Sequence, residues 1–127
     1  MIRWPWRRKQ KTHGAHGEDL AAKVHRKAGY EILDRNVKLG RNEVDILARD
    51  GDTVVFVEVK TRESPGPAFA PEDNVHATKQ RKLINAANHY IARHPDPSTY
   101  YRFDIVSVTV VHGEKPRVDL LKDAFHA

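Results

Sequence analysis

Apolar residues recur along this chain with two different periods, and the helical period appears twice. The first apolar stripe predicts a helix over residues 14–28 that ends at Gly29, a residue that commonly follows a helix C-terminus. The second stripe predicts a longer helix over residues 78–93, with Thr78 as a plausible N-cap and Pro95 as the stop. The pattern therefore places one helix near the start of the chain and one past its middle.

Between and after these helices, alternating or continuous apolar runs predict strands. The order of elements is helix, three strands, helix, two strands, which is typical of an α/β fold with a central mixed sheet of about five strands flanked by helices. Residues 1–12 read as a flexible basic arm, and residues 13–127 as a single domain. The expected strands cover residues 30–33, 41–48, 53–60, 102–111 and 117–121.

The strand over residues 53–60 carries two charges that its apolar neighbours do not require. Side chains alternate across a strand, so Glu58 and Lys60 share one face. A turn of Asp50 and Gly51 would place Asp45 diagonal to Glu58, and a loop two residues longer would place the two acids directly opposite. Both registers keep all three side chains on one face, with the acids about 5–7 Å apart.

Two carboxylates this close would repel each other unless a cation or a proton lay between them. Oxygen ligands of Mg²⁺ lie at about 2.1 Å, so Asp45 and Glu58 could converge on one ion. The ordinary alternative is that Lys60 neutralises Glu58 or Glu43 at an exposed strand end. The apolar residues that flank Glu58 argue against a solvated face and favour a divalent-metal site with a positioned lysine, an arrangement typical of phosphodiester cleavage.

Composition narrows the class of partner. The 127 residues carry a net charge of +5 with a sequence pI near 9.6, which favours a polyanion, nucleic acid before a membrane surface. There is no cysteine, which excludes disulfides and thiolate zinc sites. No apolar run approaches the length of a membrane span, and the first residues lack a secretory signal, so we expect a cytoplasmic protein. The eight histidines form no HExxH spacing, and we interpret them as surface residues.

The chain carries, in order, Glu18 on the first expected helix, Asp45, Glu58-Val59-Lys60, and Gln80 on the second expected helix. This order resembles the PD-(D/E)xK nuclease superfamily, with archaeal Holliday junction resolvases as the nearest well-understood relatives. Several short sequence stretches are similar to the YraN-like family of uncharacterised bacterial proteins. One departure is Asn42, which stands in place of the glycine usual before the acid at Glu43. The resemblance implies a restriction endonuclease-like fold. The matching stretches cover residues 16–18, 28–36, 42–48, 55–62, 79–83 and 102–106.

The resemblance also implies roles for individual residues. Asp45 and Glu58 would bind Mg²⁺ or Mn²⁺ together with the backbone carbonyl of Val59, and Lys60 would orient and help deprotonate the attacking water. Glu18 would complete the acidic site from the first helix. The remaining residues would face the substrate: Gln80 would steady the scissile phosphate or Lys60, and the nucleic-acid contacts would be Lys79, Arg62 and Arg81.

The sequence therefore predicts a metal-dependent nucleic-acid phosphodiester hydrolase, with branched DNA as the substrate suggested by the resolvases and DNA favoured over RNA. Because junction resolvases need two sites facing two strands, the resemblance also implies a homodimer. Two alternatives stay open. The chain could be a non-catalytic nucleic-acid-binding module that retains a nuclease-like fold, or a scaffold whose basic arm docks on an acidic protein.

Overall fold

The computed structural model describes residues 13–63 and 77–126, and the expected basic arm at residues 1–12 lies outside these ranges. The elements follow the predicted order of one helix, three strands, one helix and two strands. They are α2 (His13–Lys27), β1 (Glu31–Leu39), β2 (Asn42–Asp50), β3 (Thr53–Arg62), α3 (Ala77–Arg93), β4 (Tyr100–Thr109) and β5 (Arg117–Phe125).

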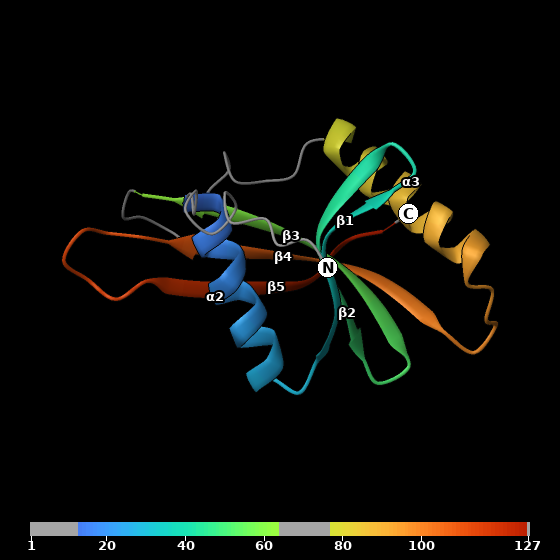
Figure 1. Cartoon of the computed structure of the whole chain (residues 1–127), viewed down its shortest axis with the longest axis horizontal. Coiled ribbons are helices and arrows are strands. Elements are labelled where there is room, and N and C mark those ends of the chain that lie inside the picture. Colours follow the sequence, from blue (N-terminus) through green and yellow to red (C-terminus); the bar gives the residue numbers. More distant parts are fainter. Residues whose placement is uncertain (1–12, 64–76, 127) are drawn as a thin grey trace, which may run out of the picture.

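The five strands form one sheet in the order β1-β2-β3-β4-β5. Neighbouring strands are antiparallel except β3 and β4, which run parallel because α3 lies between them in the chain and returns it to the same end of the sheet. This arrangement confirms the predicted α/β fold with a mixed sheet. Figure 1 shows α2 lying across β3, β4 and β5, and α3 beside the β1–β2 hairpin.

Two apolar clusters cover opposite faces of the sheet, and β3 supplies alternate residues to each. Val55 and Val57 pack beneath α2, on what we call the α2 face. Val54 and Phe56 pack against Leu83 of α3, on what we call the α3 face. Because side chains alternate along a strand, the even-numbered residues that follow in β3 continue along the α3 face.

Strand β1 differs most from its prediction. It extends to Leu39 rather than ending at residue 33, and its pairing with β2 shifts register between Ile32 and Asp34. Asn36 has a φ of 51°, a left-handed conformation that asparagine tolerates better than most residues. This irregular backbone interrupts the alternation of side chains between the two faces, from which strands are predicted. The sequence pattern therefore predicts only the first part of β1.

The turn between β2 and β3 decides between the two strand registers that the sequence left open. Asp50 pairs with Thr53, so the loop consists of Gly51 and Asp52, and the register is the one that places Asp45 opposite Glu58. Gly51 has a φ of 63°, which glycine adopts without steric cost. The turn is therefore one residue further along the chain than the expected Asp50–Gly51 pair.

Two further expectations are corrected at single residues. Helix α3 begins at Ala77, so Thr78 lies inside its first turn, where its hydroxyl accepts a hydrogen bond of 3.2 Å from Arg81. His25 is fully buried rather than on the surface, and its Nδ1 lies 2.9 Å from the carbonyl of Ala21. One turn of helix thus supplies the polar partner that this buried ring needs.

An ion-pair cluster anchors the start of β4. Arg102 contacts the fully buried carboxylate of Asp104 at 3.0 Å and the carboxylate of Asp50, at the end of β2, also at 3.0 Å. Asp104 also accepts a 2.9 Å hydrogen bond from the backbone of Asp123 in β5. These contacts give Asp104 a structural role that joins three strands, away from the predicted acid pair.

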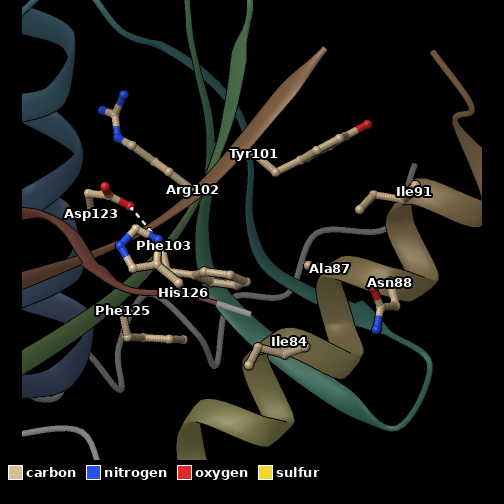
Figure 2. A pocket seen from close by; sticks show the side chains of 10 residues that line it. All are labelled: Ile84, Ala87, Asn88, Ile91, Tyr101, Arg102, Phe103, Asp123, Phe125 and His126. Carbon is tan, nitrogen blue, oxygen red and sulfur yellow. Dashed lines mark ion pairs between the residues drawn. The ribbon is translucent and has the colours of Figure 1, made fainter. Parts of the chain in front are cut away.

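A small hollow of about 110 Å³ lies between α3 and the ends of β4 and β5, and Figure 2 shows the side chains around it. Its wall is largely apolar, and Asp123 and His126 form an ion pair of 3.6 Å at its rim. None of the site residues predicted from the sequence lines it. No helix within residues 13–63 and 77–126 is long and apolar enough to cross a membrane.

Candidate metal and nucleic-acid site

The two acids predicted from the sequence lie together on the α3 face. Asp45 is two residues from Leu47, which belongs to the cluster on that face, and Glu58 follows Phe56 on β3. The strands separate just beyond the last paired residues, and Asp45 Oδ2 accepts a 2.8 Å hydrogen bond from the backbone N–H of Val59. This bond fixes the Asp45 carboxylate beside Glu58.

The environment of the two acids disfavours their charged forms. Burial raises the pKa of Glu58 to about 7, and the neighbouring charge of Asp45 adds to the rise. Burial also raises the pKa of Asp45, although the Val59 N–H and the charge of Lys79 act in the opposite direction. A hydrogen bond from the Glu58 carboxyl also lowers the pKa of Asp45, as expected when two carboxyls share a proton.

Glu18 approaches the same acids from α2. Its pKa is raised by burial and then by the charge of Asp45, and lowered by a hydrogen bond from the Asn36 side chain. The helix can come this close because Gly17 is buried against β3, where a Cβ at position 17 would overlap Thr61 Oγ1. Asn36 of β1 and the close contact of Gly17 with Thr61 therefore position Glu18 near the acid pair.

Two lysines accompany the acids. Lys60 lies two residues after Glu58 on the α3 face, and its charge acts to lower the pKa of Glu58. Lys79, in the first turn of α3, makes the direct contact: its Nζ lies 3.5 Å from Glu58 Oε1. The sequence had assigned Lys79 to the substrate, and the structure places it against a predicted metal ligand.

A polar cleft of about 200 Å³ opens in front of Asp45, between the β1–β2 hairpin and the start of α3. The hairpin tip is seated on the helix because Gly40 lies against the ring of His89, where a Cβ would come within 3.3 Å of Nδ1. The wall holds residues that sequence reasoning did not select. The lining residues are Arg41, Asn42, Glu43, Asp45, Lys79, Lys82 and Leu83.

Comparison with known proteins decides the family. A family model described as an uncharacterised protein family, UPF0102, matches residues 17–108. The chain belongs to the family UPF0102. A UPF0102 protein of Rhodococcus opacus is 42% identical over 88% of this chain and 94% of its own, and one of Geobacter sulfurreducens is 41% identical over 91% and 89%. A third, from Chlorobaculum parvum, is 47% identical over 75% of this chain and 73% of its own.

This result confirms the resemblance to the uncharacterised YraN-like family, which is UPF0102. All the site residues discussed here lie within the matched range. The family description names no activity, so the roles of these residues in this UPF0102 member stay predictions.

The remaining predicted residues of this UPF0102 chain lie around the site rather than in the cleft wall. Gln80 is half-buried near the start of α3 and does not line the cleft. Arg81 is exposed on the same turn, and Arg62 ends β3, where its carbonyl accepts a 2.8 Å hydrogen bond from Val110. Val59 contributes its N–H to Asp45, and the role of its carbonyl as a ligand stays a prediction.

The divalent metal implied for this UPF0102 member fits the donor set. Glu58 Oε1 is buried, and its charge is offset among the described residues by Lys79, whose Nζ lies 3.5 Å away, and to a smaller extent by Lys60. Within residues 13–63 and 77–126, no three Asp, Glu or His side chains gather closely enough to enclose an ion by themselves. Mg²⁺ commonly takes one or two carboxylates and completes its shell with water and substrate phosphate, which matches an acid pair beside a cleft.

Proposed function

We propose that this UPF0102 chain is a metal-dependent phosphodiester hydrolase that acts on nucleic acid, with DNA as the substrate and branched DNA as its preferred form. One observation carries the proposal: two half-buried carboxyls, Asp45 and Glu58, lie side by side at the edge of a cleft lined by Arg41, Lys79 and Lys82. Acids at the base and cations on the wall would suit a divalent ion that meets a phosphate.

The chemistry follows from where the charges lie. Water adds to phosphorus, the P–O bond to the leaving sugar oxygen breaks, and that oxygen takes a proton. Asp45 and Glu58 would hold the divalent cation, which when bound lowers the pKa of water and offsets the charge that develops on the phosphate. The ammonium of Lys60 would orient the attacking water and help deprotonate it by favouring the hydroxide form, with the proton passing to solvent, and Glu18 would hold water on the opposite side of the acid pair.

The cations of the cleft would hold the substrate backbone. Lys82 and Arg41 face the cleft from α3 and from the β1–β2 hairpin, so a phosphate placed there would be contacted from two sides. Gln80 lies one residue after Lys79, and its proposed role is to steady Lys60 or the reacting phosphate.

The test is cleavage of labelled branched and linear DNA with Mg²⁺ or Mn²⁺, for the wild type and for Asp45→Ala and Lys60→Ala. We expect branched DNA to be cut and each substitution to lower the rate by at least about 100-fold, because each removes a group that acts on the reacting atoms. Glu114→Gln, an exposed change in the β4–β5 turn, is the matched control and should retain full activity. Cleavage that survives both alanine substitutions would refute the proposal, as would failure to cut any substrate with either metal.

A second function has one observation in its favour: Arg41, Lys79 and Lys82 line the cleft and could hold phosphate without a metal ion. In that case the protein would bind nucleic acid without cutting it. Asp45→Ala would then leave affinity unchanged or raise it, because it removes negative charge from a cleft that holds phosphate. Fluorescence anisotropy in EDTA with the same DNA measures this directly.

A further inference from the structure

Helix α3 begins with cations where its own dipole favours anions. The first turn holds no acidic residue, and Lys79 lies within it. The exposed N–H groups at a helix start carry partial positive charge, so a lysine there is held by an external anion rather than by the helix. The anion in this structure is Glu58, whose Oε1 lies 3.5 Å from Lys79 Nζ.

This ion pair is unequal. The side chain of Glu58 is only 12% exposed, whereas that of Lys79 is 42% exposed. At 3.5 Å the contact is longer than an ordinary N–H···O hydrogen bond, although Lys79 still acts to lower the pKa of Glu58. Glu58 is thus held by β3, and Lys79 is the partner that can move away into solvent or into the cleft that it also lines.

A divalent cation on Asp45 and Glu58 would compete with Lys79 for the same carboxylate. Two positive charges at one buried oxygen repel each other, and the divalent ion has the stronger attraction to the acid pair. The displaced ammonium has a destination, because Lys79 shares the cleft wall with Lys82 and Arg41.

We infer that Lys79 is an exchangeable counter-ion that couples cation binding to nucleic-acid binding. It holds Glu58 in the cation-free protein, the cation takes its place, and the released ammonium then binds a substrate phosphate. The inference rests on the proposed cation site at Asp45 and Glu58. It adds that, without a cation, Lys79 stays paired with Glu58 and does not bind phosphate. Coupling of this kind is reciprocal, so nucleic acid must raise cation affinity by the same factor.

The first experiment measures Mn²⁺ binding to the DNA-free protein by titration calorimetry. Lys79→Met keeps an unbranched side chain, one atom shorter than lysine, and removes its charge, so the ion no longer has to displace a competitor. We expect Mn²⁺ affinity to rise about threefold to tenfold, the range expected for loss of a partly exposed ion pair. Lys82→Met, a change in the same cleft and the same helix, should alter Mn²⁺ affinity less than twofold.

The second experiment measures the affinity of a labelled DNA junction by anisotropy, with EDTA and with saturating Ca²⁺, and checks by gel that the DNA stays intact. Ca²⁺ takes the same oxygen ligands as the proposed metal. We expect Ca²⁺ to raise wild-type affinity, Lys79→Met to reduce that enhancement at least threefold, and Lys82→Met to weaken binding by a similar factor with and without Ca²⁺. Thermal melts establish that each variant is folded, and Lys79→Arg, which keeps the charge, should retain most of the enhancement.

The outcomes separate this inference from the proposed function. An unchanged Mn²⁺ affinity or an unchanged Ca²⁺ enhancement in Lys79→Met overturns the counter-ion role, even if the wild type cleaves DNA. The expected shifts in a protein that cuts no substrate would support the exchange and overturn hydrolysis. A wild type that binds no Mn²⁺ overturns both.

Discussion

Glu58 is the residue at which stability and the proposed chemistry conflict. Its carboxylate lies on the α3 face next to Phe56 and loses solvation by burial, and its charged neighbours include another acid, Asp45. Lys79 compensates this charge only in part, since the pKa of Glu58 still rises to about 7. A residue that destabilises its own fold without a ligand is expected at a site that binds one.

The raised pKa of Glu58 predicts how stability depends on pH in EDTA. The folded protein holds a proton on Glu58 up to about pH 7, whereas the unfolded chain releases it near the ordinary value of 4.5. Ionisation of Glu58 therefore lowers the free energy of unfolding as pH rises from about 4.5 to 7, and the full penalty is present above that range. We expect Glu58→Gln to be more stable than the wild type at pH 8 by about 1–2 kcal/mol, and nearly equal at pH 4.5.

Urea unfolding at several pH values measures this difference, and Glu114→Gln, at an exposed glutamate, is the control that should follow the wild type. A Glu58→Gln protein that is less stable than the wild type at pH 8 would show that the Lys79 ion pair outweighs the cost of burial. The pH-dependent difference should also shrink with saturating Mg²⁺, because the ion stabilises the charged acid in the wild type alone.

A close contact with β3 sets how near the start of helix α2 lies to the sheet. Gly17 is buried there, and the place of its missing Cβ is taken by Thr61 Oγ1. Thr61 is β-branched, so relieving an overlap would take a full change of rotamer. The next residue is Glu18, whose pKa responds to Asp45, so the contact also sets the distance between helix and acid pair.

Gly17→Ala is therefore expected to destabilise the protein, although alanine is the better helix former by about 1 kcal/mol. The overlap should cost about 1–3 kcal/mol, which outweighs the gain in helix propensity. Thr61→Ala removes the overlapping hydroxyl, which makes no hydrogen bond within the described residues, and should itself be nearly neutral. The double variant Gly17→Ala/Thr61→Ala should then recover most of the loss in thermal or urea unfolding, and a double variant as unstable as Gly17→Ala alone would contradict this account.

The elements show which features local sequence can predict. Strand alternation was sufficient to place Glu58 and Lys60 on one face, and both candidate registers put Asp45 beside them. The turn itself was displaced by one residue because Asp50 is held at the end of β2 by Arg102, a residue two strands away. Turn preferences depend only on neighbouring residues, so they cannot take account of an ion pair with a residue distant in sequence.

At the scale of the whole molecule, the site is assembled from contacts that are distant in sequence. Gly40 seats the β1–β2 hairpin on His89 of α3, and this contact brings Arg41 opposite Lys82 across the cleft. Arg41 lies outside the stretches that carry the resemblance, and Lys82 lies inside one without an implied role, so only the packed structure shows that both line the cleft. The resemblance supplied Glu18 and Gln80, which chain patterns alone favoured as structural residues. In the structure the pKa of Glu18 responds to the charge of Asp45, and Gln80 lies near the start of α3 outside the cleft wall.

The protein has a net charge of +5, and we expect the cations of this cleft to be the part of it that binds DNA. A salt titration of DNA binding tests this expectation. Each phosphate contact contributes about 0.9 to the slope of log affinity against log salt, because it releases condensed counterions. We expect Lys82→Ala, measured in EDTA, to reduce the magnitude of that slope by about 1 and to weaken binding to junction and duplex alike. Arg93→Ala is the matched control, an exposed cation of the same helix about 17 Å further along its axis, and should leave the slope unchanged. If both variants reduce the slope equally, the cation field is diffuse, and DNA binding is not centred on the cleft that holds the acid pair.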